Sequence, residues 1–282
     1  MYNSEYIELI VESRKLFFAC KLELANVFDS LKCYEMDSSF KSKKIGIYKY
    51  IKKLIPCFNV LLEVSYSNSI QSLITLQRMI VDNYAILYLL TTFSTKEEQL
   101  LRYYLYLLDA THSHSEILDK FSSNLKSKIP DEAYKNAYNA KTQDNKSSIE
   151  LIKIINEEKL DLIVNKEIIS KSNWKFKDAN EKDQNKNQYK WIELYSIARI
   201  PNHHAQMLQN YHSAFVHGLG ISLMIENDKD VFPFTISTTD FCSILMSLII
   251  KIIITEFKEE TKNVKLNQKT IDFANGNWNN WK

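Results

Sequence analysis

Polar residues recur at intervals of three and four along an otherwise apolar stretch, residues 68–90. They are Gln71, Thr75, Arg78 and Asp82. On an α-helix this spacing places all four on one face, and a polar group buried there costs about 1–3 kcal/mol unless it is paired. Either Arg78 and Asp82 form a structural ion pair, or the face lines a central polar cavity that binds an anion or a phosphate.

Two further segments carry the same spacing. The first comprises Glu98, Arg102, Tyr106 and Asp109, and the second, after Pro201, comprises Gln206, Asn210, Ser213 and His217. Only four of the 36 basic residues are arginine. Arg78 and Arg102 therefore indicate a need for the planar guanidinium fork in apolar segments. The segment after Pro201 is less apolar and equally well faces water.

Other chemistries find no support in the sequence. His112 and His114 are two residues apart, so on a helix they point to different faces, without an acidic or thiol partner at ligand spacing. No G-x-S-x-G, P-loop or G-x-G-x-x-G motif is present. The four cysteines stand in apolar surroundings and are interpreted as buried, reduced thiols. We expect neither a metal nor a cofactor.

Two segments resemble known helical families. Residues 68–90 resemble the R-x-x-x-[ED] helix of a poorly characterised bacterial family of helical proteins, and residues 211–218, YHSAFVHG, resemble its S-x-x-x-H segment. Residues 211–218 also resemble the R-N-x-x-x-H-G helix of the HEPN superfamily, the helical ribonucleases and nucleotidyltransferase partners of bacterial toxin–antitoxin and phage-defence systems. In HEPN ribonucleases a histidine handles protons at the 2′-hydroxyl, and an arginine stabilises the pentacovalent phosphate across a dimer.

The resemblance implies roles for individual residues. Ser213 occupies the asparagine position and His217 the histidine position, but His212 stands where the family has arginine. His217 would be the acid/base, with Tyr211 and Ser213 orienting the site. The missing cation would come from Arg78, Arg102 or Arg199. The remaining candidate binding residues are Asp82, Tyr106, Asp109 and His212.

Two details of this region allow more than one interpretation. Arg199 and His204, with four residues between them, match the R-x(4–6)-H pattern a second time, yet Arg199 is also typical of a cation at a helix C-terminus. His217 directly precedes Gly218, so we expect it at a helix C-terminus, where the macrodipole raises the pKa of the imidazole. There it would serve as a proton donor or as a structural cap.

The sequence thus leads to two functional hypotheses. The first is a HEPN-like bacterial defence or toxin-type protein acting on RNA or a nucleotide, as a metal-independent endoribonuclease and homodimer, with a protein partner from a defence operon as an option. The second is a non-catalytic helical binding or regulatory module whose polar cavity holds a small anion or a partner peptide. An exposed His217 beside an arginine would favour the first; Arg78 paired with Asp82 would favour the second.

The elements that must position these residues are all helical. Four glycines and four prolines in 282 residues leave few turns for a sheet. We expect one domain, residues 1–282, folded as an all-α, HEPN-like bundle of at least six helices, with at most a short hairpin near residues 231–236. Helices are predicted over residues 2–36, 41–66 with a break or kink at Pro56, 68–90, 96–110, 148–169, 191–199, 201–218 and 240–262. Residues 111–147 are predicted to form short helices and loops.

Composition also indicates which segments are exposed and where in the cell the protein is expected to lie. Residues 174–190 are predicted to be a mobile polar surface segment, and residues 264–282 a polar tail. The most apolar stretch, residues 241–255, is shorter than the roughly 20 residues needed to cross a bilayer, and the N-terminus lacks the pattern of a signal peptide, so we expect a cytoplasmic protein away from the membrane. The net charge of +2 predicts no general affinity for nucleic acid. Lysines over residues 41–53 form a solvated face or a phosphate-binding patch.

Overall fold

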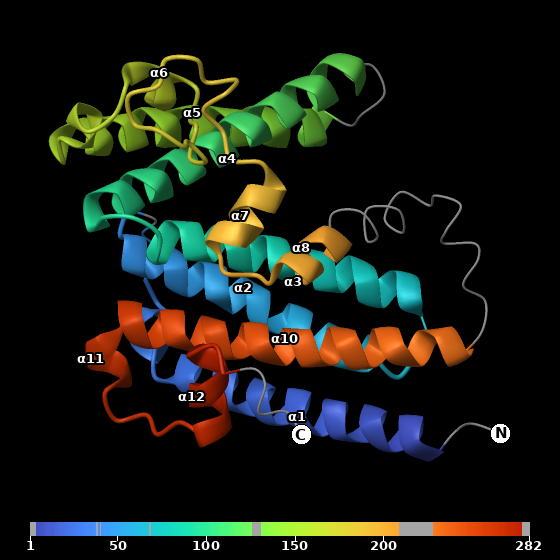
Figure 1. The fold of residues 1–282 in the computed structure, drawn as a ribbon. Helices are drawn as coiled ribbons and strands as arrows, with labels where there is room; N and C mark the ends of the chain where they lie inside the picture. The colour runs from blue at the N-terminus through green and yellow to red at the C-terminus, as the bar shows by residue number, and fades with distance from the viewer. Residues whose placement is uncertain are drawn as a thin grey trace. The chain divides into compact units, whose positions relative to one another are not determined.

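The computed structural model describes residues 4–37, 39, 41–67, 69–125, 131–208 and 228–277. Within these ranges the chain is helical and contains no strand, which confirms the all-α prediction (Figure 1). The α-helices are α1 (Ser4–Asp29), α2 (Lys43–Val64), α3 (Ile70–Thr91), α4 (Lys96–Leu125), α5 (Asp131–Glu157), α6 (Lys166–Ser170), α7 (Trp191–Ile197), α8 (Asn202–Gln206), α10 (Asp228–Glu256), α11 (Lys258–Thr261) and α12 (Gln268–Ala274). Short 3₁₀ helices cover Lys32–Tyr34 and Leu160–Leu162.

Backbone contacts divide the chain into two compact units. Unit 1 combines residues 1–91 with residues 191–282, and unit 2 is the continuous stretch of residues 92–190. The interpretation of the chain as one domain stays a prediction beside this division.

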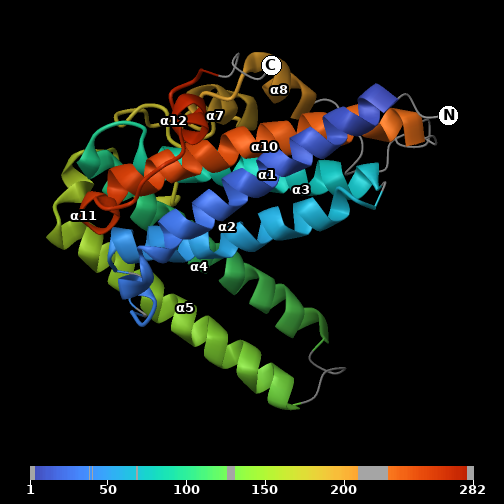
Figure 2. The same ribbon diagram turned by 90° about the horizontal axis from the view of Figure 1, so that it is seen from below.

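Helix α10 is the central helix of unit 1. It packs against α1, α3 and α12 (Figures 1 and 2). Apolar residues of α1 at heptad-like spacing, among them Phe17, Leu24 and Val27, are buried, and this spacing suits an extended helix–helix contact. On its other side α3, buried along most of its length, packs against α2 and α10.

Two helix boundaries of unit 1 differ from the sequence prediction. Helix α2 continues through Pro56 rather than breaking there. Proline removes one backbone hydrogen bond, but Leu54, Phe58 and Leu61 are buried on either side, and this tertiary packing outweighs the loss. Helix α10 begins at Asp228, so it passes through Pro233 and replaces the short hairpin considered near residues 231–236.

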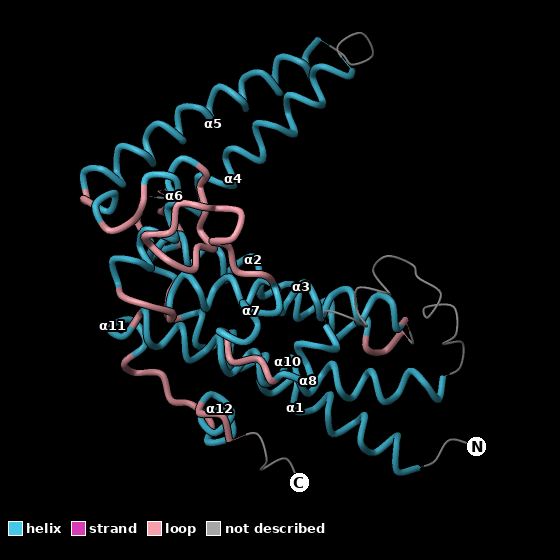
Figure 3. The backbone as a smooth tube through the Cα atoms, turned by 45° about the horizontal axis from the view of Figure 1, so that its top comes forward, coloured by secondary structure: helices cyan, strands magenta, loops and turns pink. Residues whose placement is uncertain are grey.

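Unit 2 is built on a long helical hairpin. Helices α4 and α5 lie side by side (Figure 3), so the prediction of short helices and loops over residues 111–147 was wrong. Polar contacts join the two helices: Thr111 Oγ1 lies 2.8 Å from Ser148 Oγ, and His114 Nδ1 lies 2.8 Å from Asp144 Oδ2. A sequence without an apolar stripe there still forms helices because each supports the other through polar pairs.

Two helices are long and apolar enough to cross a membrane by length and composition, Ile70–Thr91 and the part of α10 from Phe232 to Glu256. In their most apolar windows, 56% and 67% of the residues, respectively, are buried inside the protein. Buried helices of this kind form the cores of soluble proteins, so the pair is weak evidence for a membrane protein. A cytoplasmic location stays a prediction.

Candidate functional site

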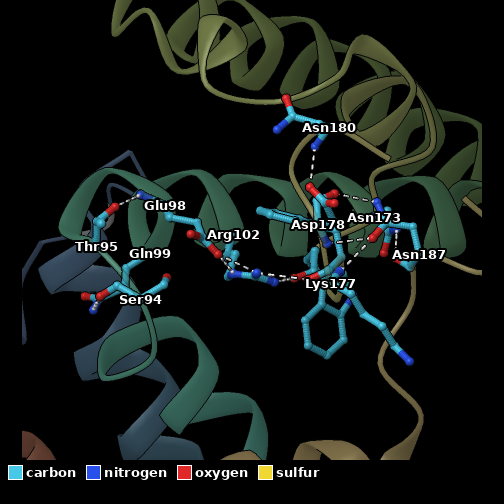
Figure 4. A network of polar contacts seen from close by, with 12 residues as sticks. Ser94, Thr95, Glu98, Gln99, Arg102, Asn173, Lys177, Asp178, Asn180 and Asn187 are labelled. Carbon is cyan, nitrogen blue, oxygen red and sulfur yellow. Dashed lines mark hydrogen bonds and ion pairs between the residues drawn. The ribbon is translucent and has the colours of Figure 1, made fainter. Parts of the chain in front are cut away.

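The Arg102 guanidinium is fully buried in unit 2 and engaged on all its nitrogens (Figure 4). Its Nε donates to Glu98 Oε1 at 3.0 Å, and Nη2 donates to the same carboxylate. Nη1 donates to the carbonyl of Trp174 at 2.8 Å, and Nη2 donates to that of Phe176 at 2.9 Å. The guanidinium also lies 3.7 Å from the centre of the Phe176 ring. Burial lowers the pKa of Arg102, and the Glu98 carboxylate opposes that shift.

The rest of this polar stripe contacts the same loop. Trp174 Nε1 donates to Asp109 Oδ2 at 3.1 Å, and the Tyr106 ring meets the Trp174 indole edge-on at 5.1 Å. Glu98, Arg102, Tyr106 and Asp109 therefore share one helix face, as predicted, and that face holds the loop that follows α6. The arrangement is structural, because the groups that would bind a phosphate are used by the protein itself.

The loop over residues 174–190 lacks helices, as expected, but it is not a segment without a core. Trp174 and Phe176 are buried, and so are the amides of Gln184 and Asn187. Asn187 Oδ1 accepts hydrogen bonds from two backbone amides, those of Lys177 and Asp178, both at 2.8 Å (Figure 4). Asparagine side chains here satisfy backbone groups that a helix would satisfy internally, which explains how an amide-rich loop adopts a fixed course.

In unit 1, Arg78 and Asp82 form the pair that the spacing predicts. Arg78 Nε lies 3.8 Å from Asp82 Oδ2, and the Tyr195 hydroxyl donates to Asp82 Oδ1. Burial raises the pKa of Asp82, whereas the Tyr195 hydrogen bond and Arg78 lower it. Tyr84 on α3 also donates to the carbonyl of Ala198, at 3.2 Å. These contacts fix α7 against α3.

Arg199 and His204 lie on either side of the turn at Pro201. Arg199 has a left-handed backbone with φ of 61° and an exposed side chain, directly after α7. The His204 ring stacks on Phe241 of α10, with ring centres 4.3 Å apart and planes 14° apart. Burial, with a smaller contribution from His203, lowers the pKa of His204 to about 4, so this imidazole is neutral at pH 7.

Two buried polar atoms near α10 have no hydrogen-bond partner, Gln77 Nε2 and His204 Nδ1. Gln77 is buried on α3, and its Oε1 accepts from Thr238 Oγ1 of α10 at 3.2 Å. Thr238 and Phe241 lie one helical turn apart, so Gln77 and His204 meet neighbouring turns of α10. The spacing argument missed Gln77, because this residue does not stand at the three- and four-residue intervals of the polar stripe.

The residues that carry the HEPN resemblance lie outside the described part of the chain. They are Tyr211, His212, Ser213 and His217. The homodimer was expected to form through an apolar face made of Met207, Leu208, Tyr211, Ala214 and Phe215, and the last three of these residues also fall there. The catalytic role of His217 and the homodimer stay predictions.

Three of the lysines over residues 41–53 form ion pairs with acidic residues. Lys43 Nζ lies 3.1 Å from Glu256 Oε2, and Lys44 Nζ lies 3.4 Å from Glu260 Oε1. Lys52 Nζ lies 2.8 Å from Glu35 Oε1. These ion pairs favour a structural, solvated face over a phosphate-binding patch.

Metal-binding and thiol chemistry can be assessed in the described residues. Among them, no three His, Cys, Asp or Glu side chains are grouped so as to hold a metal ion. Cys20 and Cys242 are buried, and burial raises the pKa of Cys20 to about 11. Cys33 is exposed and Cys57 is partly exposed, so the expectation of four buried thiols was wrong for these two.

Comparisons of the chain with protein-family models, curated proteins and solved structures find no match. The resemblance to HEPN proteins therefore stays a prediction from the sequence of residues 211–218.

Proposed function

We propose that this chain is a non-catalytic helical binding module whose ligand site lies where α3 and α8 meet α10. The unpartnered atoms Gln77 Nε2 and His204 Nδ1 support this proposal. A buried polar atom left unpaired costs about 1–3 kcal/mol, so a ligand with polar atoms beside both would recover that free energy on binding. Gln77 Nε2 can only donate, which favours a small anion or another oxygen-bearing ligand.

The arginines also favour binding over catalysis. Stabilising a pentacovalent phosphate needs a guanidinium aimed at the substrate. Arg102 is buried and bonded to Glu98 and two carbonyls, and Arg78 is paired with Asp82. A neutral His204 cannot donate a proton as a general acid at pH 7.

Thermal unfolding with inorganic phosphate, citrate and adenosine monophosphate tests the proposed site. At least one of these probes should raise the Tm of the wild-type chain, because a ligand that binds only the folded state stabilises it. Gln77→Met should abolish the shift caused by the probe, because it removes the Nε2 donor. Without ligand its Tm should stay close to that of the wild type, since the gain from removing an unpaired donor is offset by the loss of the acceptor for Thr238.

Gln99→Met is the matched control. Gln99 is also a buried glutamine, but its Nε2 donates to the carbonyl of Ser94 at 3.0 Å. Gln99→Met should lower the Tm and keep the ligand-induced shift. Should no probe change the Tm of the wild-type chain, or should Gln77→Met keep the ligand-induced shift, the proposal is wrong.

The metal-independent endoribonuclease is the second candidate, and the Arg199–His204 segment favours it. Arg199 is exposed, and the neutral imidazole of His204 has an unpartnered Nδ1. That atom is buried, so it would accept the proton of a 2′-hydroxyl only in a state in which the segment opens to admit the nucleotide. His217 would then act as the acid. RNA or a nucleotide would be its substrate, in a bacterial defence or toxin–antitoxin setting.

Labelled total RNA, incubated with the chain in the presence and absence of EDTA, decides between the candidates. Cleavage that persists in EDTA and disappears in His204→Gln or His217→Ala would establish the nuclease and overturn the non-catalytic proposal. Intact RNA under both conditions, with variants that unfold like the wild type, excludes it.

A further inference from the structure

A groove in unit 1 runs between α1 and α2. It has a volume of about 260 Å³ and is lined by Val11, Arg14, Lys15, Phe18, Leu62 and Tyr66. Three of these apolar or aromatic side chains stay exposed: Val11 (42%), Phe18 (47%) and Tyr66 (64%). Large side chains left exposed together are typical of an interaction surface.

The apolar lining continues along α1 beyond the groove. Ile7 and Leu22 are also about half exposed, and with Val11 and Phe18 they stand at intervals of four, seven and four residues, on one helix face. From Ile7 to Leu22 this stripe extends about 22 Å, the length of a helix of about 15 residues. Its dimensions suit a partner helix that lies in the groove with apolar side chains spaced by three and four residues.

Arg14 gives the groove its charge. Its Nη2 donates to the carbonyl of Ser65, and its guanidinium lies 4.1 Å from the centre of the Tyr66 ring. These contacts hold the cation in place, while Nε is buried without a hydrogen-bond partner. Two cations, Arg14 and Lys15, line the groove. Lys15 Nζ lies 2.9 Å from Glu12 Oε1, so Arg14 carries the positive charge that the groove offers to a partner.

The charges discriminate among occupants. A second copy docked through the same groove would bring the Arg14 and Lys15 cations of both chains together, since a two-fold interface pairs the same patch with itself. An anionic lipid surface would meet Glu8 and Glu12, which are exposed on the same helix. A carboxylate placed between apolar side chains complements Arg14, and a partner helix can carry that combination.

We propose that the α1–α2 groove docks an acidic amphipathic helix of a partner protein, with apolar side chains along Ile7, Val11, Phe18 and Leu22 and a carboxylate at Arg14. This surface is distinct from the Gln77–His204 site. Gln77→Met should leave docking unchanged, so the two proposals can fail separately.

The test uses two fluorescent helical peptides of about 15 residues, each with leucines spaced by three and four residues. One carries glutamates on the flanks of the leucine stripe, and the other carries lysines there. By fluorescence anisotropy the full chain should bind the glutamate peptide at least about tenfold more tightly. Arg14→Gln should erase most of that preference, and Val11→Ser and Phe18→Ser should each weaken binding about tenfold.

Ile149→Ser is the matched control, because Ile149 is also exposed and apolar but lies on α5 of unit 2. It should leave the affinity unchanged, and circular dichroism melts identify any variant that unfolds. Equal affinity for the two peptides, or no effect of Arg14→Gln, would overturn the proposal. So would a chain that elutes as a dimer and becomes monomeric in Phe18→Ser, or one that cosediments with anionic vesicles through this face.

Discussion

Arg78 and Arg102 stand in the same sequence pattern, an arginine within a polar stripe on an apolar helix, yet the two regions use it differently. Arg102 is completely buried because the loop after α6 lies over it and supplies two carbonyls. Arg78 keeps a quarter of its side-chain surface exposed and pairs with Asp82 on its own helix. How deeply each arginine is buried therefore depends on whether a second segment of the chain covers its polar stripe. The spacing of the stripe does not show whether such a segment exists.

Arg102→Met should cause the largest loss in the free energy of unfolding among the substitutions that test this difference between Arg78 and Arg102. It leaves the carbonyls of Trp174 and Phe176 without their donors and Glu98 without its partner. Loss of a buried, hydrogen-bonded charge costs about 3–5 kcal/mol, so urea denaturation should show a decrease of that order in the free energy of unfolding. Hydrogen exchange should accelerate throughout residues 172–188. A variant with unchanged exchange there would mean that the loop is held by other contacts.

A fall in pH should stabilise α10 of unit 1. Burial raises the pKa of Asp240 on α10 to about 6, although a hydrogen bond from Ser13 opposes the shift. Because the folded state binds this proton more tightly than the unfolded state, the carboxyl contributes increasing stability as the pH falls from about 7 towards 4. Amide protection of α10 should rise over this interval by about 1–2 kcal/mol after allowance for solvent screening.

Asp240→Asn is the control for the pH response. It removes the titrating carboxyl and should flatten the dependence of α10 protection on pH. An unchanged pH profile in this variant would assign the response to another group.

Tyr195→Phe weakens the link between α3 and α7. It removes the hydroxyl that donates to Asp82 and leaves a half-buried carboxylate with Arg78 alone. The expected loss is about 1–2 kcal/mol in the free energy of unfolding, measured by urea denaturation. Tyr138→Phe, at an exposed tyrosine of α5, should change nothing; similar losses in both variants would contradict the link.

Trp174→Phe should have the smallest effect on the free energy of unfolding. It tests the hydrogen bond between Trp174 and Asp109, which lies beside the contacts of Arg102. It deletes the hydrogen bond from Nε1 to Asp109 but keeps the backbone carbonyl that accepts from Arg102. Loss of about 1 kcal/mol follows from one hydrogen bond. A loss as large as that of Arg102→Met would show that the indole, rather than the guanidinium, holds the loop.

Local patterns predicted much of the fold. The scarcity of glycine and proline indicated helices throughout, and the chain turns at Pro201 after α7. The errors have one cause. Pro56 and Pro233 lie inside helices, and residues 111–125 and 131–147 are helical, because tertiary contacts override local preference.

The candidate site was harder to predict than the fold. Spacing correctly paired Arg78 with Asp82 and placed Glu98, Arg102, Tyr106 and Asp109 on one face. It could not show that the Trp174 and Phe176 carbonyls, more than 70 residues along the chain, bind Arg102, because backbone groups leave no mark in a sequence. Gln77 went unnoticed for a related reason, since an unpartnered atom is a property of its neighbours.

The interruption of unit 1 by unit 2 has a consequence for synthesis on the ribosome. Helices α1 and α3 emerge first, but α10, against which both pack, begins only at Asp228. At about 5–20 residues per second, the apolar faces of α1 and α3 wait on the order of ten seconds or longer for their partner, while the contacts of unit 2 close within its own continuous stretch. The nascent chain should therefore bind chaperones through its N-terminal helices until α10 has left the exit tunnel.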